Sequence, residues 1–81
     1  MEYCTVIELF DGAINNVYLF SGTTIKEAKN KANKKFLDLC EEYIEDFDDY
    51  TEKERLNILF DGWISNAHHD FSIWWPIKEK N

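Results

Sequence analysis

The sequence predicts an α+β fold, in which one long amphipathic helix packs on one face of an antiparallel sheet of three or four strands. Three observations lead to this prediction. Apolar residues alternate with period two over residues 3–10, 17–20 and 71–77, they recur every three to four positions from residue 25 onward, and neither glycine nor proline interrupts residues 23–61. A chain of 81 residues supports only one core, so we expect a single domain spanning residues 1–81.

We expect a β-hairpin over residues 3–21. Residues 3–10 form its first strand, with Cys4, Val6, Glu8 and Phe10 on one face and the odd-numbered residues on the other. Asp11-Gly12 is a strong hairpin signal because both residues tolerate a positive φ. Asn15-Asn16 is a second candidate for the turn, so the pattern leaves the length of the loop open.

The long helix begins with a capping box, in which Thr24 is followed three residues later by Glu27. The spacing predicts a helix from about Thr24 to a position between Asp46 and Tyr50. One side of this helix is apolar and faces the sheet. Its members are Ile25, Ala28, Ala32, Phe36, Leu39, Cys40, Tyr43, Phe47 and Tyr50.

Residues 52–66 fit two structures. Thr51 and Glu54 form a second capping box, and Leu56, Leu59, Phe60 and Trp63 keep helical spacing, which favours a short second helix. The alternative is a duplicated hairpin, because residues 59–62 repeat the Leu-Phe-Asp-Gly of residues 9–12.

The last strand is predicted over residues 71–77. Phe71, Ile73, Trp75 and Ile77 form its inward face, and Pro76 restricts the strand to an edge of the sheet or to its own end. Residues 78–81 are expected to be a frayed tail.

Composition excludes several classes of protein. The sequence has no apolar run near the roughly 20 residues that a membrane span needs, and no signal peptide, so we expect a cytoplasmic protein that binds no membrane. Cys4 and Cys40 are far apart in the chain and lack metal-type spacing, so we expect two buried thiols.

No pattern predicts an enzyme, a cofactor or a metal site. His68 and His69 are adjacent, so on a strand or a helix their rings diverge and cannot easily share one ion; surface loop histidines are expected. The serines, threonines and cysteines carry no nucleophile signature, and the glycines lie in turns rather than in a phosphate-binding loop.

Five lysines between residues 26 and 35 make the first half of the long helix basic. This pattern fits either a nucleic-acid footprint or ordinary solvent-exposed lysines, and we expect no direct contact with nucleic acid because the net charge of the chain is −7.

The strongest signal is a run of nine carboxylates against two cations over residues 38–55. In a helix these charges would follow one another every ~3 Å, close to the phosphate spacing of about 3.4 Å along a DNA strand. The macrodipole disfavours lysines at the start of a helix and carboxylates at its end, so folding alone does not explain the arrangement. The residues predicted to bind a partner are Asp38, Glu41, Glu42, Glu45, Asp48, Asp49 and Glu52.

This charge pattern leads to a functional hypothesis, a small acidic inhibitor or modulator whose acidic helix face docks on a basic, nucleic-acid-binding protein. In size and charge the chain resembles the small acidic anti-defence proteins of phages, such as anti-restriction and anti-CRISPR proteins, and the resemblance implies a nucleic-acid mimic. Two alternatives stay open. One is an immunity protein or antitoxin that neutralises a cognate toxin, and the other is an assembly module that dimerises through exposed aromatic residues, above all Trp74.

Overall fold

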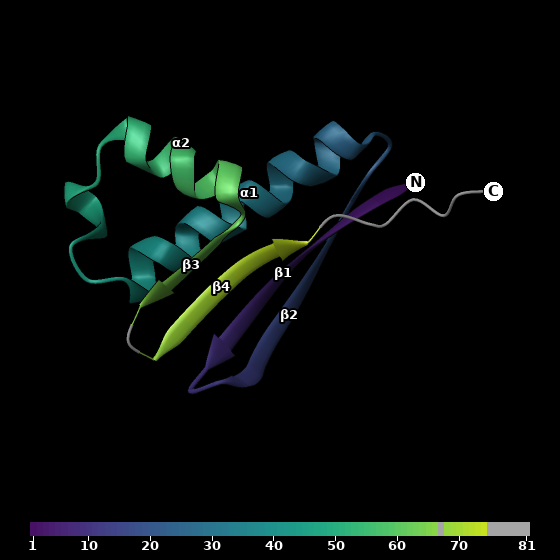
Figure 1. The fold of residues 1–81 in the computed structure, drawn as a ribbon. Helices are drawn as coiled ribbons and strands as arrows, with labels where there is room; N and C mark the ends of the chain where they lie inside the picture. The colour runs from purple at the N-terminus through teal and green to yellow at the C-terminus, as the bar shows by residue number, and fades with distance from the viewer. Residues whose placement is uncertain (67, 75–81) are drawn as a thin grey trace.

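The computed structural model describes residues 1–66 and 68–74, and it has two layers (Figure 1). One layer is a four-stranded antiparallel sheet in the order β2-β1-β4-β3, and both helices lie on the same side of it. The predicted α+β class is confirmed. The elements are β1 (Glu2–Phe10), β2 (Ala13–Gly22), α1 (Ile25–Tyr43), the 3₁₀ turn η1 (Phe47–Asp49), α2 (Glu52–Asp61), β3 (Trp63–Asn66) and β4 (His69–Trp74).

The hairpin of β1 and β2 turns at Asp11-Gly12, as predicted. Both residues have a positive φ, 51° and 82°, as a two-residue type I′ turn requires. The other candidate turn lies within β2 instead. Glu8 pairs with Asn16 and Leu9 pairs with Ile14, so Asn15 is the extra residue of a β-bulge.

Helix α1 begins as predicted, because the Thr24 side chain accepts a hydrogen bond from the Glu27 amide at 3.2 Å. The predicted end between Asp46 and Tyr50 is wrong. The helix stops at Tyr43, Ile44 is extended, and Asp46 has a φ of 63°. This reversal brings Phe47 into the core from η1, where its ring is 1% exposed. The apolar period runs on through the turn, so the sequence carries no signal for the break.

Residues 52–66 form α2 and then β3. The helical interpretation is confirmed by a complete capping box at Thr51 and Glu54. The duplicated hairpin is wrong, because residues 59–62 end a helix and Gly62, with a φ of 78°, is its left-handed cap. Strand β3 instead pairs with β4, which gives the sheet its fourth strand.

Strand β4 begins two residues before the predicted strand, and Phe71 and Ile73 are buried on its inward face as expected. The part of the prediction that concerns Trp75, Pro76, Ile77 and residues 78–81 lies outside the described residues.

The core lies between α1 and the sheet. Ala28 and Ala32, both fully buried, let the start of α1 approach the strands closely, and larger side chains fill the space near its end. Cys4 and Cys40 are buried free thiols, as predicted. Burial raises the pKa of the Cys40 thiol to about 12, which keeps it protonated and unreactive at neutral pH. No helix in the described part of the chain is both long and apolar enough to span a membrane.

Candidate partner-binding surfaces

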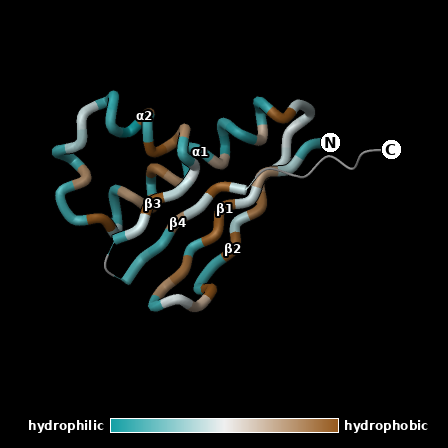
Figure 2. Tube along the Cα trace, in the orientation of Figure 1, coloured by the Kyte–Doolittle hydropathy of each residue, from teal (hydrophilic) through white to brown (hydrophobic). Residues whose placement is uncertain are grey.

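The predicted acidic site does not lie on one helix face, because α1 ends at Tyr43. The two helices are joined by a connector, residues 44–51, which includes η1. The structure distributes the predicted residues over the end of α1, this connector and the first turn of α2, at one end of the molecule (Figures 1 and 2). The comparison with DNA phosphates required these charges to follow one another regularly along one straight helix. That prediction is therefore wrong. We call the seven residues the acidic surface: Asp38, Glu41 and Glu42 on α1, Glu45 in the connector, Asp48 and Asp49 in η1, and Glu52 on α2.

All seven side chains of the acidic surface are exposed. Among the described residues one cation pairs with them, since Arg55 Nη1 lies 3.3 Å from Glu41 Oε1. The Glu42 carboxylate is the main cause of a raised pKa at the neighbouring Tyr43 phenol. Asp38 stands apart, because it also lines a cleft with three lysines of α1. The acidic surface is thus largely unneutralised between Glu42 and Glu52.

Helix dipoles account for some of these charges and not for others. Glu52 lies in the first turn of α2, where the dipole favours an anion. Glu41 and Glu42 lie in the last turn of α1, which contains no basic residue, so the dipole opposes them. The helix dipole therefore does not explain the carboxylates at the end of α1.

Arg55, the only arginine of the sequence, fixes the connector in place. Its guanidinium donates to the carbonyl oxygens of Phe47 (3.2 Å) and Tyr50 (3.4 Å), contacts Glu41, and lies 4.7 Å from the centre of the Phe47 ring. In the sequence pattern Arg55 is only one of the two cations within the acidic run of residues 38–55. Nothing in a linear pattern shows that the connector folds back over it.

Glu8 is a buried carboxylate that lies apart from the acidic surface. It is 1% exposed on the helix-facing side of β1. Its oxygens accept hydrogen bonds from Asn15 (3.3 Å), Asn16 (3.0 Å) and the Tyr18 hydroxyl (3.4 Å). The alternation of β1 did place Glu8 on this face, but its donors come from the bulged register of β2.

The two histidines differ from each other. His68 is exposed, as expected, and its Nδ1 lies 2.6 Å from Asp11 Oδ1. His69 is not a surface loop residue, because it begins β4 and stacks on Tyr43 with ring centroids 4.7 Å apart. Within the described residues its Nδ1 is buried without a hydrogen-bond partner, and no group of three or more potential ligands is arranged to hold a metal.

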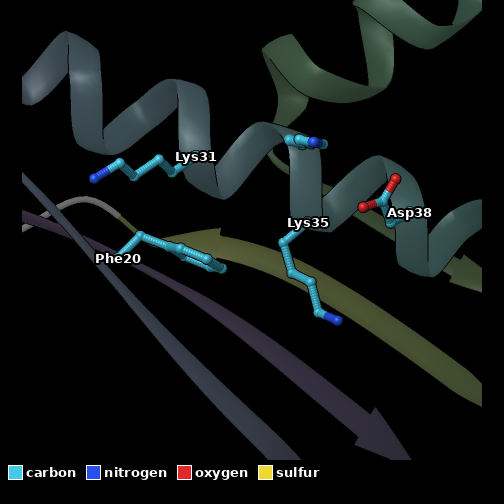
Figure 3. Close-up of a pocket in the computed structure, with 5 residues that line it drawn as sticks. Phe20, Lys31, Lys35 and Asp38 are labelled. Carbon is cyan, nitrogen blue, oxygen red and sulfur yellow. The ribbon is translucent and has the colours of Figure 1, made fainter.

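Three lysines of α1 line an open cleft of about 300 Å³ against β2, together with Phe20 and Asp38 (Figure 3). Lys31 donates to the Ser21 carbonyl at 2.8 Å, and the Lys35 ammonium lies 4.5 Å from the centre of the Tyr18 ring. Two of the three lysines that line the cleft, Lys31 and Lys35, thus have partners within the protein.

The sheet face opposite the helices forms a second candidate surface. Directly opposed residues of antiparallel strands point to the same side of a sheet. One row across this face therefore consists of Leu19, Thr5 and Trp74. The next row consists of Val17, Ile7, Ser72 and Trp63. No described element covers these rows, and Leu19, Trp63 and Trp74 are 66%, 61% and 58% exposed.

No family model matches the chain, and neither the curated proteins nor the solved structures compared with it include a similar one.

Proposed function

We propose that this protein acts by binding another protein, and that the acidic surface docks on a basic, nucleic-acid-binding partner as an inhibitor or modulator. The observation that carries the proposal is the cluster of exposed carboxylates at the end of α1 and in the connector. Among the described residues, one ion pair, Arg55 with Glu41, neutralises part of this cluster. Like charges in such proximity repel one another, so a binding role gives a reason for keeping them.

The proposed partner follows from charge. A protein of net charge −7 is repelled by nucleic acid and by anionic membranes, and it is attracted to surfaces rich in lysine and arginine. Such surfaces are typical of proteins that bind nucleic-acid backbones. Occupation of that surface by the acidic surface would exclude the nucleic acid.

The fixed connector supports this proposal. Arg55 ties the carbonyls of Phe47 and Tyr50 to the start of α2, and the Phe47 ring anchors η1 in the core. The carboxylates of η1 are therefore presented from an ordered segment, which lowers the conformational entropy lost on binding.

The test uses the variant in which Glu42, Glu45 and Asp49 are all replaced by lysine. We expect the tagged wild-type protein to capture nucleic-acid-binding proteins from an extract of the source cell, and we expect duplex DNA or RNA to displace them. Capture should weaken steeply as salt rises, because both charged surfaces exchange counterions. The triple variant should capture none of them.

The matched control is Asp61→Lys, which reverses one exposed carboxylate at the other end of α2, about 14 Å from Glu52 along the helix. It should capture the same proteins as the wild type. Capture that survives the triple reversal, or that neither salt nor nucleic acid disturbs, would contradict the proposal.

A further inference from the structure

We propose that the open face of the sheet binds a second copy of this chain and forms a symmetric dimer. The inference is independent of the acidic surface, which lies at the opposite layer of the molecule. It starts from the six exposed apolar side chains that the pairing registers place on this face, namely Tyr3, Ile14, Val17, Leu19, Trp63 and Trp74.

The area of this face fits an interface. Each of the six side chains is between 44% and 68% exposed. If a large apolar side chain presents roughly 150–200 Å² when fully exposed, the six together present about 600 Å². That is at the upper limit of the largest apolar patch on a typical monomer. With the half-buried Ile7 and Leu9 added, it approaches the ~800 Å² that each partner buries in an interface of standard size.

The composition of the face also fits an interface. Two tryptophans and a tyrosine share this face with aliphatic residues, and aromatic residues are enriched where proteins meet. Asp70, which pairs with Leu9 and Ser65, is the one carboxylate that the registers place on this side. Sheets that pack face to face bury such alternating apolar positions between them.

The distribution of charge favours a second copy of this chain as the partner that binds the open face. Two chains that each carry −7 repel each other, so they can associate only where carboxylates stay apart. Stacking of two sheets about 10 Å apart leaves the helical layers roughly 30 Å apart, well beyond the ~8 Å over which salt screens charge. The open face is the side on which two copies meet without bringing their acidic surfaces together.

Self-complementarity follows from the same geometry. In a two-fold symmetric dimer one patch packs against its own copy, so the patch needs no opposite charge on the partner. A face that is apolar and nearly uncharged meets this condition. A strongly basic partner, by contrast, would find on this face one carboxylate among the described strand residues, Asp70.

The test measures the molar mass of the 81-residue chain by sedimentation equilibrium over a wide range of concentrations. We expect the wild type to approach twice the 9.7 kDa of one chain. Leu19→Asp should raise the dimer dissociation constant by about a hundredfold or more, because the interface would then bury an unpaired carboxylate from each copy. Higher salt should leave the wild-type dimer intact or strengthen it, since salt screens the repulsion between the two chains.

Leu56→Asp is the matched control, because Leu56 is 59% exposed on α2, in the helical layer. This variant should dimerise like the wild type. Circular dichroism must show that both variants fold. A wild-type mass of 9.7 kDa at all concentrations would overturn the proposal, and so would equal dissociation by Leu19→Asp and Leu56→Asp.

Discussion

Glu8 illustrates how a single charged residue is accommodated in the core. A buried carboxylate is costly unless hydrogen-bond donors replace water. The bulge in β2 supplies them, because the extra residue allows both Asn15 and Asn16 to reach the two carboxylate oxygens. The Tyr18 hydroxyl adds a third donor. Burial is the largest cause of the raised pKa of this phenol, and the nearby Glu8 carboxylate is the next. The bulge is thus part of how Glu8 is held.

Phe47 anchors the connector, and its contribution can be measured. Phe47→Ala should lower the free energy of unfolding by about 3–5 kcal/mol, because it removes a fully buried ring and leaves a cavity beneath Arg55. Chemical denaturation measures the difference.

The control for this prediction is Phe60→Ala, since Phe60 is 91% exposed on α2. Its replacement should change the free energy of unfolding by no more than a few tenths of a kcal/mol. If both variants lose the same amount of stability, the placement of Phe47 in the core is wrong.

At the scale of elements, α2 depends on its first turn. The Thr51 side chain accepts a hydrogen bond from the Glu54 amide at 3.1 Å, and the Glu54 carboxylate accepts one from the Thr51 amide at 3.0 Å. The helix has no fully buried residue. Because little packing supports it, its stability depends more than that of α1 on the capping box.

Thr51→Ala should therefore destabilise the protein by about 1 kcal/mol at neutral pH. The effect should be concentrated in α2, where amide hydrogen exchange should accelerate. Lys53→Ala, an exposed change in the same turn, should leave exchange unchanged.

The effect of Thr51→Ala should also depend on pH. Hydrogen bonds from the amide and side chain of Thr51 lower the pKa of Glu54 below its ordinary value of 4.5. When folding lowers the pKa of a carboxylate, the carboxylate contributes its full stabilisation at any pH above its pKa in the unfolded state. This stabilisation is lost as the pH falls through its lower pKa in the folded state. The difference between wild type and Thr51→Ala should thus be largest at neutral pH. A difference that grows in acid would contradict this account.

The whole molecule has two surfaces that differ in their physics. The acidic surface would act through long-range forces that salt weakens. The open sheet face would act through contact between apolar side chains, which salt does not weaken. A protein with both surfaces could bind a partner at one end and its own copy on the opposite layer.

The net charge also predicts how stability responds to salt. Added salt should raise the Tm of the wild type, because it screens repulsion within a chain of net charge −7. The variant with lysine at positions 42, 45 and 49 has a net charge of −1, since each reversal replaces a negative by a positive charge. Its Tm at low salt should equal or exceed that of the wild type, because a cation at position 42 also suits the end of α1.

Thermal unfolding of both proteins at several salt concentrations checks this prediction. The dependence of Tm on salt should be smaller in the triple variant. A large loss of stability in that variant would mean that the carboxylates support the fold.

The sequence predicted those elements whose signals are local. The caps at Thr24 and Thr51 and the turn at Asp11-Gly12 are where the pattern placed them, because each depends on hydrogen bonds or φ angles within a few residues. The ends of elements were harder to predict. The break after Tyr43 and the strand after Gly62 serve the packing of Phe47 and the pairing of β3 with β4, which are contacts between distant parts of the chain.

The sequence by itself determined the α+β class, the alternation that divides β1 into two faces, the apolar stripe of α1 and the excess of carboxylates after residue 37. Only the tertiary structure decided that these carboxylates are spread over a folded connector, that Glu8 is buried with its donors, and that one face of the sheet carries an apolar patch. The physical reason is that secondary structure follows from short-range periodicity, whereas exposure and surface shape depend on which segments meet. The predicted acidic residues were therefore found exposed, but on a surface that the linear pattern could not describe.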